Sequence, residues 1–494
     1  MTVDASRDAL GQPRGIFLIF TTEIWERFSF YGMRGLLVLF LSSATLAGGF
    51  GWTASRALEV YATYTALVYI VPIVGGYLGD RYLGRRRAVV LGSALMMMGH
   101  FMMVVPGAAP HVLGFLVGFP VYDVLHGSGI TLGNLSLGAD AVNAMQTYSA
   151  ANGLGQSPDG VMSLAYMLTS WGFYLALLFI ITGTGFFKSN MATMVGELYA
   201  QDDPRRDAGY TIYYTGANIG AFAANLVAGT VGELYGWHYG FSVAGVGMAL
   251  GLAIFIRQAP RQLADIGERP RASVQAASVR LSWAEKRRVA GILLISLFTI
   301  VFWMGFEQGG GLLNIIVRDS VDRQMMGAEV PVTWFQSLNP MFIFLFAPLF
   351  VAFWGVLARR RIDLHPTTKY ALGLVLMGAS MVLLLGAQAE IDRLGYCSAW
   401  WLVAVFAVQT AGELAISPVS KSLVSRYAPK QIASPLMGCE FACYAAGAWL
   451  AGLIGVWALN NHASDVFFLL LMVSVAAAGL CLLLRPVLDR LLDR

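Results

Sequence analysis

The sequence predicts an all-α polytopic membrane protein with 12 transmembrane helices in two six-helix bundles. Hydrophobic residues make up 57% of the 494 residues and charged residues only 13%, whereas soluble proteins carry about 25% charged residues. Twelve long apolar segments recur along the chain, and a helix needs about 20 such residues to cross a bilayer. A basic, polar stretch separates the sixth segment from the seventh and divides the chain into halves.

The twelve segments are expected at 16–41, 56–79, 87–106, 166–198, 208–233, 238–257, 288–316, 335–357, 368–388, 398–423, 433–458 and 465–486. This division predicts a cytoplasmic N-terminal segment at 1–15, an N-terminal bundle at 16–257, a cytoplasmic linker at 258–287, a C-terminal bundle at 288–486 and a cytoplasmic tail at 487–494. Repeat-built secondary transporters show such a layout, although channels and membrane enzymes also contain many helices.

The lysines and arginines predict the orientation of the chain. They gather in the loops after the second, fourth, eighth and tenth segments, and none occurs between Arg87 and Lys188. Cytoplasmic loops carry this excess, so we expect both termini in the cytoplasm and a cytoplasmic (inner) membrane location. The connection at 107–165 is then an outer insertion, with an interfacial or re-entrant helix or a lid. The net charge of +4 is too scattered to indicate nucleic acid.

The first apolar segment carries four charged residues: Glu23, Glu26, Arg27 and Arg34. A charge in the middle of a membrane costs on the order of 2.5 to 3.5 kcal/mol. At about 100° per residue these side chains and Tyr31 lie close to one helix face, which we expect to line a protein interior or a wet cavity. An ion-pair ladder that only stabilises the helix is the alternative.

Other charges fall inside later segments with opposite signs in the two halves. Lys188 lies in the fourth segment, whereas Glu307, Glu413 and Glu440 lie in the seventh, tenth and eleventh. A cavity that is cationic on one wall and acidic on the other suits a zwitterion, and it also suits salt bridges that protons or substrate break. Polar or aromatic neighbours accompany these charges: Trp303, Asn339, Ser417, Tyr214 and Asn218. The last two lie beside Gly216 and Gly220, which also permit plain helix packing.

The loop GGYLGDRYLGRRR after the second segment resembles the cytoplasmic loop motif of the major facilitator superfamily. Its matching residues are Gly76, Asp80, Arg81, Gly84, Arg85 and Arg86. An aspartate at a helix end beside several arginines predicts a latch that opens when the two halves rock. Positive-inside anchoring alone would explain the arginines but not the aspartate or the glycines.

Several strings in order resemble the proton-dependent oligopeptide transporter family, a branch of that superfamily. They are EIWERFSFYG from Glu23, GTGFFKSN around Lys188, YYTGANIG, YGWHYGF, FWMGFEQ, WFQSLNP and GELAISP. The matches run through nearly the whole chain. The resemblance implies a major facilitator fold and alternating access by two six-helix bundles.

The resemblance also implies a role for each matching residue. Glu23, Glu26, Arg27, Lys188 and Glu307 would couple protons. Arg34 and Lys188 would hold the peptide carboxylate, and Glu413 with Asn339 would hold the amino group, close to Ser417. Tyr31, Tyr69, Tyr214, Asn218 and Trp303 would contact the peptide or shape its cavity.

The sequence departs from the family pattern at four points, one of which is the outer insertion at 107–165. Phe30 stands where the family has the first tyrosine of Tyr-Tyr-Gly. The linker of about 30 residues is too short for the two extra helices that many bacterial members carry. Glu440 stands where the family often has a tryptophan, so we expect it in the substrate site, where it would favour peptides with basic side chains. The alternatives are that it pairs with Lys188 or faces elsewhere.

These observations predict a proton-coupled symporter that imports di- and tripeptides, works as a monomer in the lipid bilayer and needs no cofactor or metal. The alternatives are a transporter of another small anion or zwitterion, such as an amino acid, a conjugate or nitrate, and a non-transporting sensor or scaffold. An enzyme is not expected, because the histidines and cysteines lack metal-ligand spacing and no nucleophile motif is present.

Overall fold

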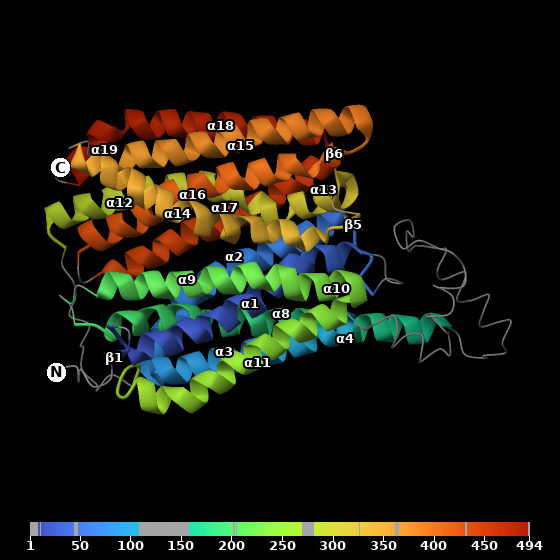
Figure 1. The fold of residues 1–494 in the computed structure, drawn as a ribbon, viewed down its shortest axis with the longest axis horizontal. Coiled ribbons are helices and arrows are strands. Elements are labelled where there is room, and N and C mark those ends of the chain that lie inside the picture. The colour runs from blue at the N-terminus through green and yellow to red at the C-terminus, as the bar shows by residue number, and fades with distance from the viewer. Residues whose placement is uncertain are drawn as a thin grey trace. The chain divides into compact units, whose positions relative to one another are not determined.

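A computed structural model describes residues 8–9, 11–43, 48–107, 158–200, 203, 205–268, 281–325, 327–360, 365–429 and 432–492. The chain forms two compact units. The first unit comprises Met1–Ala57 and Arg86–Gly267, and the second comprises Leu58–Arg85 and Glu268–Arg494. Long helices run side by side within each unit (Figure 1).

Each of the twelve predicted segments coincides with helix. The first unit contains α1 (Arg14–Ser42), α3 (Arg85–Met102), α4 (Val104–Gly107), α8 (Pro158–Glu197), α9 (Arg206–Ala224), α10 (Thr230–Tyr235) and α11 (Trp237–Gln262). The second contains α2 (Ala54–Leu78), α12 (Trp283–Phe306), α13 (Leu312–Ser320), α14 (Leu338–Arg359), α15 (Pro366–Leu394), α16 (Ala399–Tyr427), α17 (Ala433–Asn460), α18 (Ala463–Leu483) and α19 (Arg485–Leu491).

Nine helical stretches of the described residues are long and apolar enough to cross a membrane. Helix α1 falls outside this set because every 18-residue window of it contains more than two charged side chains. The fold confirms the prediction of an all-α polytopic membrane protein. Most of the predicted outer insertion, residues 108–157, lies outside the described residues, and so does its predicted interfacial helix or lid. Its last residues belong to α8, which begins at Pro158.

In the first unit, α1 packs against α9 and α11. Gly216 and Gly220 allow α9 to approach α1 closely: a Cβ atom on Gly220 would lie 2.2 Å from the carbonyl oxygen of Ile24. Helices α3 and α8 meet in the same way, since a Cβ on Gly92 would lie 2.6 Å from the carbonyl oxygen of Gly183. Small residues bring membrane helices into such van der Waals contact.

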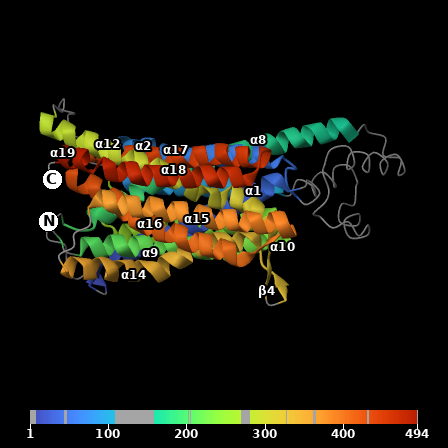
Figure 2. The same cartoon turned by 90° about the horizontal axis from the view of Figure 1, so that it is seen from above.

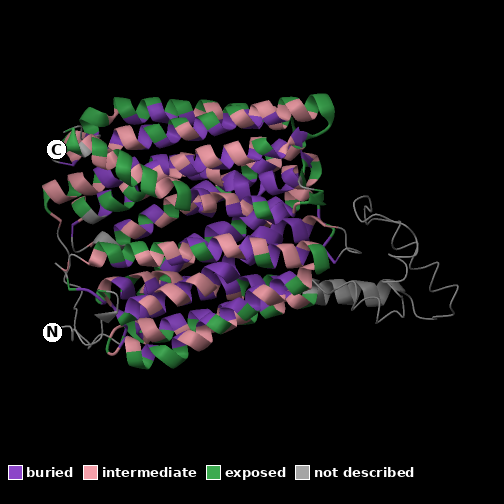
Figure 3. Ribbon diagram, in the orientation of Figure 1, coloured by how far each residue is buried: buried purple, intermediate pink, exposed green. Residues whose placement is uncertain are grey.

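In the second unit, α15 lies beside α16 and α18, and α12 packs on α17 (Figures 1 and 2). Buried residues follow the helix faces turned toward neighbouring helices (Figure 3). The contacts also place most of α2 in this unit, where Ala62 meets α17 at Gly452. The bundle boundaries 16–257 and 288–486 remain a prediction.

The seventh predicted segment is not one continuous α-helix. Helix α12 ends at Phe306, a 3-10 turn covers Glu307–Gly310, and α13 begins after Gly311. The break coincides with three consecutive glycines at 309–311, which permit such a change of backbone conformation. Pro340 lies in the first turn of α14, where a missing N–H costs no helical bond.

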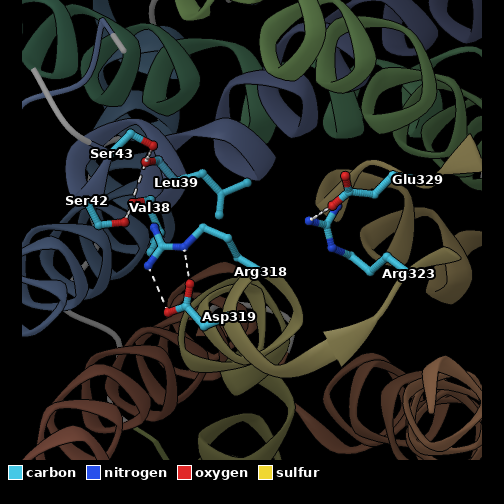
Figure 4. Close-up of polar contacts among 8 residues, drawn as sticks. All are labelled: Val38, Leu39, Ser42, Ser43, Arg318, Asp319, Arg323 and Glu329. Carbon is cyan, nitrogen blue, oxygen red and sulfur yellow. Dashed lines mark hydrogen bonds and ion pairs between the residues drawn. The ribbon is translucent and has the colours of Figure 1, made fainter. Parts of the chain in front are cut away.

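Short strands and polar contacts lie beside the ends of several helices. Strand β1 (Asp8–Ala9) pairs with β2 (Gln12–Pro13), β3 (Val321–Asp322) runs parallel to β6 (Cys397–Ser398), and β4 (Gln324–Met325) pairs with β5 (Ala328–Glu329). Arg323 pairs with Glu329 across the β4–β5 hairpin, and Arg318 pairs with Asp319 (Figure 4). At the end of α1, the hydroxyls of Ser42 and Ser43 donate to main-chain carbonyls one turn earlier.

Candidate functional site

Two carboxylates and one guanidinium lie buried together on α1. The Nε atom of Arg27 donates to Oε1 of Glu23 at 2.7 Å and lies 3.3 Å from Oε2 of Glu26. Both glutamates are 0% exposed, and Arg27 is 8% exposed. The i,i+4 spacing places Glu23 against Arg27, while Glu26 has an ion pair but no hydrogen-bond partner among the described residues. The predicted role of these groups in proton coupling stays a prediction.

Two residues from other helices complete this cluster. The phenol of Tyr213 on α9 is hydrogen-bonded to Glu23, and the positive charge of Lys188 on α8 acts on Glu26. The structure therefore brings together the predicted residues Glu23, Glu26, Arg27 and Lys188. Tyr213 was missed by the sequence reasoning, which selected its neighbour Tyr214.

Arg34 and Tyr31 lie farther along α1 and are both half-buried. The guanidinium carbon of Arg34 lies 5.7 Å from the centroid of the Tyr31 ring, within the range of a cation–π contact. Phe30, at 1% exposure, packs edge-on against the same ring. A tyrosine hydroxyl at position 30 would need a partner in this apolar interior, so the departure from the family pattern fits the local packing.

Tyr214 and Asn218 lie one turn apart on α9. Tyr214 is 40% exposed, and Asn218 is 7% exposed. The amide of Asn218 donates to the carbonyl oxygen of Tyr214 at 2.9 Å, which leaves its side-chain oxygen for another partner. Their predicted contact with a peptide stays a prediction.

In the second unit, Asn339 fixes the position of Glu413. The Nδ2 atom of Asn339 donates to Oε2 of Glu413 at 2.9 Å and to Oγ1 of Thr410 at 3.0 Å. Asn339 lies in the first turn of α14, whereas Thr410 and Glu413 lie one turn apart on α16. Ser417, half-buried, follows Glu413 by one further turn on the same face. Thr410 was not selected from the sequence, although its spacing to Glu413 is the signal that would have indicated it.

Glu307 lies at the break after α12 and is 2% exposed. The hydroxyl of Tyr444, on α17, donates to Oε1 of Glu307 at 2.6 Å. The Tyr444 ring also lies between two predicted site residues, with its centroid 3.8 Å from that of Tyr69 and 4.1 Å from that of Trp303. Tyr444 was missed, because a tyrosine in an apolar helix does not reveal a partner on another helix.

Glu440 is bonded within the second unit. Its Oε1 atom accepts from Thr299 of α12 at 3.2 Å and from Ser420 of α16 at 2.5 Å, and the side chain is 7% exposed. The charge of Glu440 also acts on the phenol of Tyr370 on α15. These contacts connect helices on three sides of Glu440; its predicted place in the substrate site stays a prediction.

The predicted gating loop forms two separate sets of contacts. In the second unit, Arg85 donates to Asp80 at 2.7 Å, and Arg81 donates to Tyr77 at 2.9 Å. These residues are largely exposed, and such surface pairs contribute about 0 to 1 kcal/mol. Gly84 has φ +82°, a conformation that favours glycine. Gly76 is half-buried on α2.

Arg86 instead bonds to the residues that follow α11 in the first unit. Its Nη1 donates to the carbonyl oxygen of Ala264 at 2.7 Å, and its main-chain N–H donates to that of Gly267 at 3.0 Å. The N–H of Gly267 donates to Glu197, at the end of α8. Arg86 thus holds the start of the predicted linker against α8, a role that the latch hypothesis did not include.

No group of three or more histidine, cysteine, aspartate or glutamate side chains that could hold a metal ion occurs among the described residues.

The candidate site consists of two sets of groups. The first unit holds the cluster of Glu23, Glu26, Arg27 and Lys188, with Arg34 nearby on α1. The second unit holds Glu413 with Asn339, and Glu307 with Tyr444.

The sequence of the chain is similar to those of known proteins. The family model described as "POT family" matches residues 86–283 and 266–462. The chain is 31% identical to a di-/tripeptide transporter of Lactococcus lactis subsp. cremoris over 495 residues, which cover 87% of this chain and 86% of the relative. It is 27% identical to the dipeptide and tripeptide permease A of Erwinia pyrifoliae, over 99% of this chain and 96% of that protein.

The fold is also similar to solved structures. A crystal structure of the peptide transporter POT in complex with sulfate is 26% identical, with a TM-score of 0.80, and the match covers 99% of this chain and 97% of that one. A mutant of a peptide transporter POT in complex with alafosfalin gives the same TM-score, identity and coverage.

Proposed function

The chain belongs to the POT family, and from that premise we propose that it is a proton-coupled symporter that imports di- and tripeptides by alternating access. It is a multi-pass membrane protein of a transporter family. We place it in the cytoplasmic membrane with both termini in the cytoplasm, and we propose that the monomer transports without a cofactor. The pattern of basic loops supports this orientation.

The observation that carries the proposal is the orientation of Glu413 by Asn339, at 2.9 Å, in a half of the chain whose predicted segments also carry Glu307 and Glu440. An ammonium group finds its complement there. Nitrate has no ammonium group, so Glu413 supports a peptide over nitrate. We propose that Arg34 and Lys188 bind the peptide carboxylate, because cations on long side chains are the usual partners of a carboxylate.

We propose that the buried cluster on α1 couples proton movement to transport. Arg27 is shared between Glu23 and Glu26, so protonation of one carboxylate frees the guanidinium for the other. The charge of Lys188 acts on Glu26, so a peptide carboxylate that draws Lys188 away would raise the cost of keeping Glu26 ionised. Peptide binding and proton binding would then favour each other.

We propose further substrate contacts on the basis of the family resemblance. Tyr31, Tyr69, Tyr214 and Asn218 would contact the peptide backbone, and Trp303 and Ser417 would border the site. Glu440 would act on side-chain preference. Asp80, Arg81, Arg85 and Arg86, with Gly76 and Gly84, would form the gating loop.

Uptake into proteoliposomes tests this function. With an inward proton gradient, we expect accumulation of radiolabelled dialanine, and competition by tripeptides but not by nitrate or free alanine. Glu413→Gln removes the charge that pairs with the amino group and should lower uptake at least tenfold. Asp392→Asn, which removes an exposed carboxylate of the same unit, is the matched control and should retain uptake. Dialanine uptake that does not respond to the gradient would contradict the proposal.

A further inference from the structure

Tyr444 makes a buried contact with Glu307 that the proposed function does not use. Its hydroxyl donates to Oε1 of Glu307 at 2.6 Å, and the carboxylate is 2% exposed. The two residues are 137 positions apart in the chain. A hydrogen bond from a neutral hydroxyl to a carboxylate is stronger in such an interior than in water, because the ionised oxygen has little solvent to replace it.

Aromatic rings fix the position of the Tyr444 hydroxyl. The ring of Tyr444 lies 3.8 Å from the ring of Tyr69 and 4.1 Å from that of Trp303, centroid to centroid. Ala66 and Ala445 pack in the same cluster, and their small side chains leave room for this close stacking. Contacts with these two rings therefore hold the Tyr444 ring, and with it the hydroxyl, in place beside Glu307.

A charge of the same sign acts on Glu307 within the second unit. Glu413 of α16 acts electrostatically on Glu307. Tyr444 of α17 donates a hydrogen bond to Glu307, and Tyr69 of α2 contacts the ring of Tyr444. Two carboxylates in one apolar region disfavour each other's ionised forms, whereas a hydrogen bond to the ionised form favours it. Tyr444 thus offsets the repulsion between Glu413 and Glu307.

We propose that Tyr444 is a positioning residue for the proton step at Glu307. It stabilises and orients the ionised carboxylate of Glu307, and its ring contacts Tyr69 and Trp303. The proposed function assigns these two residues to the peptide site, and this inference rests on that function. A peptide that displaces either ring moves the hydroxyl away from Glu307. The carboxylate then accepts a proton from hydronium, one carboxyl O–H bond forms, a water molecule is released, and Tyr444 keeps its own proton.

The test is the Tyr444→Phe variant, which removes the hydroxyl and keeps the ring. Proton-driven dialanine uptake should persist, with its half-maximal external pH about one unit higher, a tenfold change in proton activity. Peptide counterflow at equal pH on both sides should remain within about twofold of the wild type. Tyr64→Phe, which removes the hydroxyl of a buried phenol on α2, is the control and should leave the pH profile in place.

Infrared difference spectroscopy of the purified protein reads the same group without transport. The carbonyl stretch of protonated Glu307 is identified by its loss in Glu307→Gln. In Tyr444→Phe this band should persist to a pH about one unit higher than in the wild type. An unmoved band and an unmoved uptake profile would show that Tyr444 is only a packing residue. If the wild type takes up no peptide, the proposed function fails, and the infrared band still decides whether Tyr444 sets the proton affinity of Glu307.

Discussion

At the scale of single residues, Asn339 decides how Glu413 presents its carboxylate. The amide donates to both Glu413 and Thr410, so it orients the acid, while the Thr410 hydroxyl donates to the carbonyl oxygen of Phe406. A hydrogen bond to a charged group contributes about 1.5 to 3 kcal/mol. Similar logic applies to Arg27, whose removal would leave two buried carboxylates together.

We therefore expect Asn339→Leu to raise the KM for dialanine about tenfold or more while the protein remains folded. The leucine fills a similar volume but cannot donate to Glu413. Initial rates of uptake in proteoliposomes at several dialanine concentrations provide the measurement. Thr410→Val, which removes only the hydroxyl beside Glu413, should change the KM less than threefold. A KM equal to that of the wild type in Asn339→Leu would show that Glu413 does not need this orientation.

Sequence reasoning found the charged residues of the site but not all of their partners. Glu23, Arg27 and Lys188 stood out because ionised groups are costly in a membrane, whatever surrounds them. Tyr213 and Tyr214 are adjacent, about 100° apart on a helix, and the sequence does not show which of the two faces α1. Tyr444 and Ser420 are compatible with an apolar helix as plain packing residues. Their partners lie on other helices, and only the packing of those helices identifies them.

At the scale of elements, the contact between α1 and α9 depends on a glycine. A Cβ atom on Gly220 would lie 2.2 Å from the carbonyl oxygen of Ile24 and 2.8 Å from Cβ of Arg27. The second distance places the glycine directly beside the charged cluster. Helix periodicity predicted both helices, and the closeness of their backbones follows from the absence of side-chain atoms at this position.

Gly220→Ala should force α9 away from α1, because the atoms that the new Cβ would meet include main-chain atoms of Ile24 and Phe28 that cannot rotate aside. We expect a loss of about 1 to 3 kcal/mol in stability, seen as a lower melting temperature in detergent, together with reduced uptake. Gly479→Ala on α18 is the control. No atom of the described residues lies within 4 Å of a Cβ there, and alanine favours a helix by about 1 kcal/mol over glycine. Equal melting temperatures for the two variants would contradict this account of the contact.

The connection between α8 and α9 carries a pH-dependent element. Both the side chain and the main-chain N–H of Arg205 donate to Asp203, and these hydrogen bonds hold the pKa of the Asp203 carboxyl below its usual value. A lowered folded-state pKa contributes stability above the unfolded-state pKa, and this contribution is lost as the pH falls through the folded-state value.

The wild type should therefore melt at a higher temperature than Asp203→Asn at pH 7, and the difference should disappear when the pH falls below the lowered pKa. Differential scanning fluorimetry at pH 7 and near pH 3 measures it. Asp207→Asn, on the next helix, controls for a general effect of lost negative charge. A difference between wild type and Asp203→Asn that is the same at both pH values would refute the assignment.

At the scale of the whole molecule, the distribution of arginines predicts which loops face which side. The loop with Arg85 and Arg86 and the connection around Asp203 should lie in the cytoplasm, whereas the β4–β5 hairpin should lie outside. Length and hydropathy predicted the helices behind this topology. They could not predict the short strands, because pairs of two-residue strands have no sequence period to detect.

In a cysteine-free background, Ala328→Cys should react with a membrane-impermeant maleimide in intact cells. Arg87→Cys, at the exposed N-terminal end of α3, should react only after the cells are permeabilised. Mass spectrometry or a gel-shift reagent measures both reactions. Labelling of Arg87→Cys from the outside would overturn the proposed orientation, and with it the direction of transport.

The stack of Tyr69, Tyr444 and Trp303 has an optical consequence. The indole of Trp303 lies against the phenol that bonds to Glu307, and indole emission is sensitive to nearby charge and to the contact of neighbouring rings. A variant in which the other tryptophans are replaced by phenylalanine would leave one intrinsic fluorophore beside the proton site. Its emission intensity would then follow protonation or peptide binding in real time, without a label and on the timescale of a stopped-flow experiment.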